Sequence, residues 1–368
     1  MIKYLCIENF KSLRSQSLGL APLNLFFGIN GMGKSSVIQS LLLLRQSYFK
    51  NGNLSRLNLN GELAELGTVK DIYSYNAKDL SVRFYMKETE GAEYDCSYDY
   101  LYGHEQDDFM TGNVKGNHVL ERSALFNDSF SYLSAEHIGP RKLYDTENAL
   151  DRHCTRFGTF GEYVVPYLAV NGDTERVPEG LCLDDGKSDR LIDQVSAWMR
   201  LISPGAKVHA EILDGIEKAK LSLSYVSGNL ESNKILPVNT GFGIPYALPL
   251  IVELLTSEKD GLVIMENPES HLHPRGQSMI AKLIAKAAAS GTQIICESHS
   301  DHIINSICLD VKNKIISPDD VAVSYFYKDD EQDSIISELY LDEHGILNDY
   351  PEGLLDEWGI LSSQLILK

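Results

Sequence analysis

Short apolar runs of strand length alternate along this chain with longer stretches of helical composition. Residues 2–7 and 23–27 are such runs, and the second one leads directly into Gly28. Residues 34–48 are rich in Ile, Leu, Gln and Arg and contain neither Gly nor Pro. The pattern therefore predicts two strands and a helix, with a glycine-containing loop between the second strand and the helix.

The last third of the chain repeats the strand and helix patterns in regular order. This order is typical of a largely parallel sheet with helical connections, so the pattern predicts an α/β fold. The predicted strands are residues 262–265, 292–296, 321–327 and 335–341, and the predicted helices are residues 277–289 and 301–309.

The region between about residues 50 and 237 is less regular, with short apolar segments, aromatic residues and acidic patches. A helical pattern returns at residues 191–202, and a strand pattern returns at residues 219–226. The region has no sustained heptad repeat, so we expect no long coiled-coil arm.

Composition and charge narrow the functional classes. The chain has 368 residues, of which 43% are hydrophobic, so it can bury a sizeable core. Its 52 acidic and 33 basic residues give a formal net charge of -19. This charge repels phosphate backbones, so any contact with nucleic acid requires a local basic patch.

The sequence shows no sign of a membrane segment or a secretion signal. Its start, MIKYLCIENF, lacks a charged region followed by an apolar one, and the apolar run at residues 38–44 is short. A membrane-spanning helix needs about 20 apolar residues. The six cysteines are scattered without a CxxC pair, which favours reduced, buried thiols. We therefore expect a cytoplasmic protein that does not associate with membranes.

Residues 28–36, Gly-Ile-Asn-Gly-Met-Gly-Lys-Ser-Ser, match the phosphate-binding pattern GxxxxGK[ST] in full. The glycines let backbone N–H groups turn towards phosphate oxygens, and the helix that follows directs its positive end to the same place. The alternative, a glycine turn without a ligand, is disfavoured by the strand before it and the helix after it. The pattern predicts ATP and Mg²⁺ as cofactors, held by Asn30, Gly31, Met32, Gly33, Lys34, Ser35 and Ser36. Lys34 is expected to reach the β- and γ-phosphates, and Ser35 to ligate Mg²⁺.

A carboxylate follows the predicted strand at residues 262–265. We expect Glu266 to ligate Mg²⁺ together with Ser35 and to act in catalysis. Asn267 occupies the position at which ATP-hydrolysing sites with this phosphate-binding loop usually carry a glutamate that acts as general base. An amide can orient water but cannot accept its proton, so we expect hydrolysis that is slow or that uses another base such as Glu269.

A second glycine-containing segment precedes a helical stretch at residues 246–255. It comprises Thr240, Gly241 and Gly243, about twenty residues before Glu266. Taken alone, this segment suits a helix-capping turn. Beside the Gly28 loop and Glu266, it suits a second edge for binding phosphate.

Three histidines are candidate site residues. His299 follows the strand at residues 292–296, where its imidazole can hydrogen-bond a γ-phosphate or the attacking water, and the alternative is a loop histidine satisfied by the backbone. His271 and His273 suggest a zinc site, but no third ligand has a suitable spacing.

Together these motifs resemble the ATPase heads of the SMC/ABC class of P-loop NTPases. The matching parts are Walker A at residues 28–36, a signature-like TGFGI at 240–244, Walker B at 262–266 and a switch histidine at 299. Within that class the chain resembles OLD-type and related bacterial AAA-family ATPases, through IENFKSLR at 7–14, ENPESHLHP at 266–274 and ESHS at 297–300. YLSAEHIGPRKLY at 132–144 and YPEGLLDEW at 350–358 resemble a subfamily whose C-terminal segment has no assigned chemistry.

The resemblance implies a mixed sheet flanked by helices and a divided ATPase head. The predicted parts are a head formed by residues 1–75 and 236–330, an α+β lobe inserted at 76–235, and a C-terminal segment, 331–368, packed on the head. It also implies a head-to-tail homodimer, in which the signature-like loop at 240–243 closes over ATP bound to the other subunit. Residues 270–273 then fall at the D-loop position, on the dimer interface.

The chain departs from the pattern of this class in three places. Asn267 replaces the usual catalytic glutamate. No glutamine lies between Gln46 and Gln106, where a Q-loop is expected, and Glu62, Glu65 and Asp71 are its possible surrogates. The 69 residues after His299 are too few for the Toprim nuclease domain of OLD-type proteins, so we expect none.

Three functions follow from the resemblance. The first is an ATP-driven dimeric switch for a separate effector, a nuclease or a toxin encoded nearby, in bacterial defence against phages or in toxin control. The second is a DNA-repair ATPase of the RecF kind, which the net charge of -19 does not favour. The third is a nucleotide-binding scaffold that hardly turns over, a reading suggested by Asn267.

Overall fold

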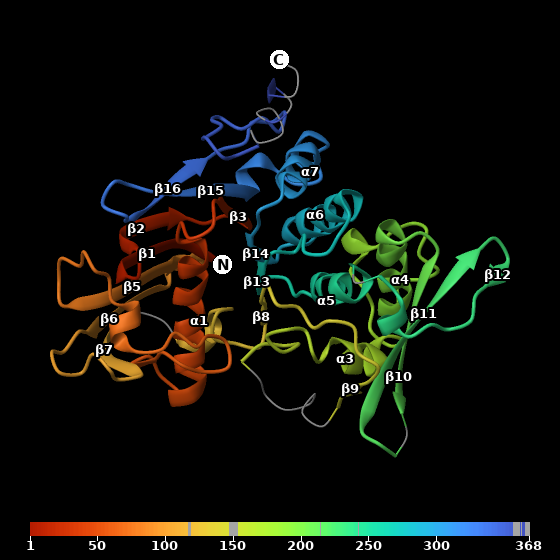
Figure 1. The fold of residues 1–368 in the computed structure, drawn as a ribbon, viewed down its shortest axis with the longest axis horizontal. Helices are drawn as coiled ribbons and strands as arrows, with labels where there is room; N and C mark the ends of the chain where they lie inside the picture. Colours follow the sequence, from red (N-terminus) through yellow and green to blue (C-terminus); the bar gives the residue numbers. More distant parts are fainter. Residues whose placement is uncertain are drawn as a thin grey trace. The chain divides into compact units, whose positions relative to one another are not determined.

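The computed structural model forms two compact units (Figure 1). The first unit comprises residues 1–127 and 317–368, and the second comprises residues 128–316. The structure describes residues 1–116, 119–146, 154–213, 215–241, 243–355, 361, 363 and 364.

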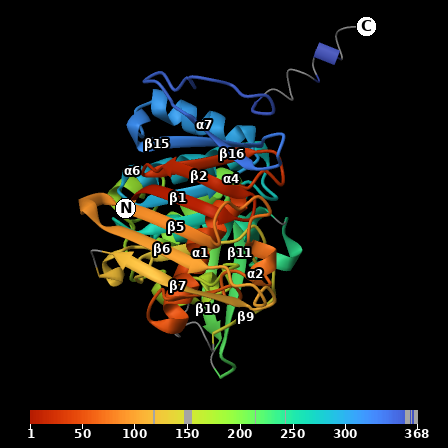
Figure 2. The ribbon, with the colours of Figure 1, turned by 90° about the vertical axis from the view of Figure 1, so that its left-hand side faces the viewer.

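An antiparallel sheet forms much of the first unit, with strand order β2-β1-β5-β6-β7-β4. Figure 2 shows β2, β1, β5, β6 and β7 in this order. Every second residue of β5 is buried, as the alternation of polar and apolar residues in its sequence requires. The strands are β1 (Ile2–Phe10), β2 (Leu13–Gly19), β4 (Arg56–Asn58), β5 (Ser81–Glu88), β6 (Glu93–Asp99) and β7 (Phe109–Gly116).

The rest of the first unit carries the glycine loop. Strand β3 (Leu23–Gly28) is parallel to β15 (Val321–Lys328), and β15 is antiparallel to β16 (Ser334–Leu339). Helix α1 (Lys34–Asn51) follows the loop and buries most of its apolar side chains. The short helix α2 is Val69–Ile72.

Three parallel strands and three helices form one part of the second unit. Strand β13 (Leu262–Glu266) lies between β8 (Phe130–Leu133) and β14 (Gln293–Glu297). Helix α6 (Pro274–Ala289) packs against both α5 (Gly243–Leu255) and α7 (Asp301–Lys312).

The other part of the second unit contains a small sheet and two helices. Trp198 of α4 is buried, and its indole Nε1 donates to the carbonyl oxygen of Leu181 at 2.9 Å. The elements are α3 (Val164–Asn171), α4 (Leu191–Ile202), β9 (Tyr144–Asp145), β10 (Ala206–Leu213), β11 (Lys218–Ser227) and β12 (Leu230–Glu231). Short 3₁₀ turns in the two units are Thr89–Gly91, Leu120–Arg122, Glu179–Leu181, Pro237–Asn239 and Pro318–Asp320.

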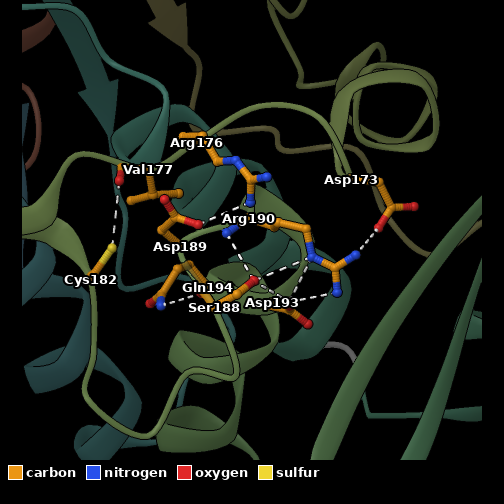
Figure 3. Close-up of polar contacts among 9 residues, drawn as sticks. All are labelled: Asp173, Arg176, Val177, Cys182, Ser188, Asp189, Arg190, Asp193 and Gln194. Carbon is orange, nitrogen blue, oxygen red and sulfur yellow. Dashed lines mark hydrogen bonds and ion pairs between the residues drawn. The ribbon is translucent and has the colours of Figure 1, made fainter.

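Polar contacts fasten the start of α4 (Figure 3). Arg190, the residue before the helix, donates to Asp193 at 2.9 Å and to Asp173 at 3.0 Å. Ser188 also donates to Asp193, at 2.6 Å, so two side chains of the segment before the helix are held by this carboxylate in its first turn.

The predicted helices and strands at both ends of the chain are all present. The division into units differs from the predicted one, because β5 pairs with β1 across the boundary at residue 76. Strand β8, which falls in the predicted inserted lobe, pairs with β13. Among the described residues, no helix is long and apolar enough to span a membrane.

Candidate nucleotide-binding site

The glycine loop connects the end of β3 to the start of α1 in the first unit. Its three glycines have positive φ angles, 139° at Gly28, 80° at Gly31 and 102° at Gly33. A Cβ atom at Gly28 would overlap the carbonyl oxygen of Phe326, and one at Gly33 would overlap the hydroxyl group of Ser334. No described atom lies within 4 Å of a Cβ placed at Gly31. Packing therefore requires glycine at both ends of the loop, whereas at Gly31 the backbone conformation alone favours it.

Lys34 begins α1 and is 3% exposed. Its Nζ donates to the carbonyl oxygens of Gly28 at 2.7 Å and of Ile29 at 3.0 Å. The ammonium group thus lies inside the curve of the loop, towards which the N-terminus of α1 also points its positive end. The remaining predicted contacts belong to the same loop and first helical turn, namely Asn30, Gly31, Met32, Gly33, Ser35 and Ser36.

Two carboxylates end neighbouring parallel strands in the second unit. Glu266 of β13 lies opposite Glu297 of β14 in the strand register. Tyr132 of β8 donates from its hydroxyl group to Glu266 Oε1 at 3.1 Å. Burial, and next the charge of Glu297, raise the pKa of Glu266 to about 7.

Sequence reasoning did not select Glu297, although this residue opens the quoted motif ESHS. It is 5% exposed and ends a strand, as Glu266 does. The available signal was the pairing of two predicted parallel strands that both end in glutamate. This signal depends on knowing that the strands are neighbours and in register, which no local pattern reveals.

The carboxylate pair fits a divalent cation. Both groups offer oxygen ligands, and a bound cation would offset the burial and the Glu297 charge that disfavour the charged form of Glu266. The described residues contain no cluster of three or more His, Cys, Asp or Glu side chains suited to a metal ion. Mg²⁺ suits a site with few protein ligands, because it retains waters and takes substrate phosphate oxygens.

Asn267 and Glu269 follow β13 and connect it to the loop after β14. Asn267 has a φ of 49°, and its backbone N–H donates to the carbonyl oxygen of Glu297 at 2.8 Å. Its side-chain oxygen is buried and has no hydrogen-bond partner in the described part of the chain. Glu269 accepts from Ser298 Oγ at 2.8 Å and from the backbone N–H of His299 at 2.7 Å. Glu269 therefore holds the loop that carries the exposed His299.

His271 and His273 make contacts that account for them without zinc. The His271 ring lies 4.2 Å from the Tyr246 ring, measured between centroids. His273 caps α6 by accepting a hydrogen bond from the backbone N–H of Arg275 at 3.3 Å.

The signature-like loop lies beside the predicted D-loop segment. Thr240 donates from its hydroxyl group to the carbonyl oxygen of Pro237 at 2.8 Å, and Gly241 is exposed. Gly243 begins α5, and a Cβ atom there would lie 2.9 Å from the carbonyl oxygen of His271. Phe242, within the quoted TGFGI, lies outside the described residues.

Profiles of known protein families match residues in both units. The sequence profile described as "AAA ATPase domain" matches residues 1–154 and 187–304. The chain belongs to this AAA ATPase family. The match spans the loop at 28–36, the segment at 240–243, the residues at 266–269 and His299. A second profile, described as "Protein of unknown function (DUF3696)", matches residues 316–365 of this AAA ATPase. No curated protein sequence matches it significantly.

Solved structures show the fold of this AAA ATPase. An SMC head bound to the C-terminal winged-helix domain of ScpA aligns with a TM-score of 0.51 and 12% identity, over 93% of this chain and 98% of that chain. An SMC head from Pyrococcus furiosus, with an extended coiled coil and bound to the C-terminal domain of ScpA, aligns with a TM-score of 0.51 and 11% identity, over 100% of both chains. These alignments confirm the predicted α/β fold, which is like that of SMC ATPase heads, and the profile match confirms the predicted AAA-family ATPase.

Proposed function

We propose that the P-loop and the Glu266–Glu297 pair act together as one ATP·Mg²⁺ site. The observation that carries this proposal is the in-register position of two carboxylates at the ends of β13 and β14, because a cation bound there would offset the cost of holding two like charges side by side. Bound Mg²⁺ would supply charge neutralisation at the β- and γ-phosphates. Ser35 and Glu266 are its proposed protein ligands.

Each predicted residue then has a distinct role. Lys34 exchanges its two carbonyl acceptors for phosphate oxygens, which offer a stronger, charge-assisted hydrogen bond. Asn267 orients the attacking water through its amide, whose buried oxygen is without a partner in the described structure. His299 contacts the γ-phosphate or the water.

Two carboxylates, Glu269 and Glu297, are placed to act as the general base. Glu269 already accepts hydrogen bonds on both oxygens, but an ionised carboxylate has about four acceptor sites, so it can still accept from water. Glu297 lies opposite Glu266 and is more deeply buried. We propose slow hydrolysis with one of these two groups as the base.

The proposed output is a nucleotide-driven switch. ATP bound to one subunit would be closed over by Thr240, Gly241 and Gly243 of a second copy, giving a homodimer. The exposure of Gly241 and the closeness of Gly243 to the D-loop segment support this arrangement. SMC heads of the same fold are bound by ScpA domains in their crystal structures, and we propose by analogy an effector protein, a nuclease or a toxin.

We place the switch in the cytoplasm, in anti-phage defence or toxin control. Purification of the protein expressed from its native operon tests this role, because a stoichiometric second protein and loss of phage resistance on its deletion are expected. Absence of both would contradict the role and leave the ATPase unaffected.

The second candidate, a DNA-repair ATPase of the RecF kind, predicts ATP-dependent binding of duplex DNA that weakens steeply with salt. The net charge of -19 counts against it. The third candidate, a nucleotide-bound scaffold, predicts assembly with ATP and no phosphate release even with the effector present.

The shared site is tested by measuring Mg²⁺-dependent ATP binding in variants of each unit. Lys34→Ala is expected to abolish ATP binding, and Glu266→Gln to abolish the gain in affinity that Mg²⁺ gives. The control is Glu343→Gln, whose side chain is 84% exposed. If Glu266→Gln keeps the full Mg²⁺ gain, the carboxylates and the P-loop do not share a site.

A further inference from the structure

The C-terminal segment, which matches the profile of unknown function, contacts the P-loop at three points within the first unit. We propose that this segment is a positioning element that holds the P-loop in its phosphate-binding conformation. The inference rests on the proposed binding of ATP at residues 28–36.

The first contact lies where the chain leaves β3. Phe326 of β15 is opposite Gly28 in the parallel register, and its carbonyl oxygen occupies the place that a Cβ at Gly28 would need. Phe326 is fully buried, with its ring centroid 5.3 Å from that of Phe26. Strand β15 therefore fixes the first end of the loop.

The second contact lies where α1 begins. Ser334, the first residue of β16, packs against Gly33, the residue that precedes the helix. Ser334 is held by Ser12, to which it donates from its backbone N–H at 2.8 Å and from its hydroxyl group at 2.7 Å. Arg14 pairs with neighbouring Asp333 at 3.0 Å. These contacts fix the second end of the loop.

The third contact lies beside Ile29, the residue that follows Gly28. Tyr325 donates from its hydroxyl group to the carbonyl oxygen of Glu352 at 2.6 Å. Gly353 follows with a φ of 87°, and a Cβ atom there would lie 2.8 Å from Tyr325 Oη and 3.6 Å from Ile29 Cδ1. The backbone N–H of Leu354 closes the turn by donating to the carbonyl oxygen of Pro351 at 3.0 Å. The turn formed by residues 351–354 thus rests on both Tyr325 and Ile29.

A loop held at both ends and at Ile29 loses less conformational freedom when it closes around phosphates. Such preorganisation raises affinity without any new contact to the ligand. On this proposal the segment from β15 to Leu354 sets the affinity of the P-loop for nucleotide by positioning the loop.

The test compares Tyr325→Phe and Gly353→Ala with the wild-type chain. The matched control is Gly345→Ala, which also replaces a C-terminal glycine of positive φ, in a turn held by Asp342. Calorimetric titration with ADP and Mg²⁺ gives the affinity, and hydrogen exchange of residues 28–36 without nucleotide gives the order of the loop. Loss of one hydrogen bond predicts about fivefold weaker ADP binding for Tyr325→Phe. Faster exchange is expected in both variants, and neither change in Gly345→Ala.

A double-mutant cycle of Ile29→Ala with Tyr325→Phe adds a second measurement that does not depend on any single variant's stability. Non-additive effects on ADP affinity are expected, because both side chains lie against the same turn at Gly353. If the variants lower the melting temperature but leave affinity and loop exchange at wild-type values, the segment only packs on the loop and the inference is wrong. If the wild type binds no ADP while Tyr325→Phe still speeds loop exchange, the positioning stands and the proposed nucleotide site fails.

Discussion

Among single residues, Glu266 has a pKa that should respond to a cation bound beside it. Its pKa rises on folding from the ordinary 4.5 to about 7, first through burial and then through the charge of Glu297. The stability that this group contributes in the absence of a metal is therefore complete below about pH 4.5 and lost as the pH rises through about 7. Mg²⁺ binds the ionised carboxylate, so its stabilising effect grows as the pH rises through the same region.

The corresponding prediction concerns the melting temperature with and without Mg²⁺ at pH 6, 7 and 8. The wild-type shift caused by Mg²⁺ is expected to increase with pH, and Glu266→Gln to show a small shift at every pH. Glu343→Gln, an exposed control, should follow the wild type. An equal, pH-independent shift in wild type and Glu266→Gln would refute the cation site.

The P-loop glycines allow a second prediction at this scale. Alanine at Gly28 or Gly33 meets backbone or side-chain atoms and also needs a positive φ, so each change should cost about 1–3 kcal/mol of unfolding free energy. Gly31→Ala has the same backbone cost but open space for its methyl group, so it should be the mildest of the three. Urea unfolding measures the order, and a Gly31→Ala loss as large as that of Gly33→Ala would contradict the loop packing described above.

At the scale of elements, the N-terminus of α7 connects the His299 loop to the rest of its unit. Ser300 accepts a hydrogen bond from the backbone N–H of His302 at 3.1 Å and donates to Gln277 Oε1 at 2.6 Å. Ser300→Ala should therefore cost about 1 kcal/mol of unfolding free energy. Ser317→Ala is the control, because Ser317 precedes a 3₁₀ turn without a side-chain cap. Unchanged urea midpoints for Ser300→Ala would show that the cap does not stabilise α7.

Sequence patterns predicted the elements well where periodicity was local. The helix predicted at 191–202 matches α4 at both ends, because an amphipathic stretch of that length favours one structure. Pairing between distant strands was not predictable in this way. The joining of β1 with β5, and of β8 with β13, depends on which apolar faces meet in three dimensions.

In the candidate site, too, residues of a continuous motif were predictable, and residues brought together by strand pairing were not. The P-loop residues were predicted because their whole motif is continuous in sequence. Glu297 was missed because its relevance arises from the register with Glu266 across two strands. The hydrogen bonds from Ser298 and His299 to Glu269 were likewise beyond reach, since 29 and 30 residues separate these partners.

For the molecule as a whole, the site residues are divided between its two units. The P-loop lies in residues 1–127, whereas Glu266, Glu297, the signature-like loop and His299 lie in residues 128–316. On the proposed mechanism neither unit alone can hydrolyse ATP, so turnover and assembly report on the complete chain.

The most direct test measures ATP hydrolysis and molecular mass by light scattering on the same samples, with and without Mg²⁺. The variants are Lys34→Ala, Glu266→Gln, Asn267→Glu, Glu269→Gln and Glu297→Gln. The wild type is predicted to hydrolyse ATP slowly and to double its mass with ATP. Lys34→Ala is predicted neither to hydrolyse ATP nor to dimerise, and Asn267→Glu is predicted to hydrolyse ATP faster than the wild type. Whichever of Glu269→Gln and Glu297→Gln removes the general base is predicted to dimerise with ATP without hydrolysing it. Hydrolysis and dimerisation of Lys34→Ala at wild-type levels would contradict the account.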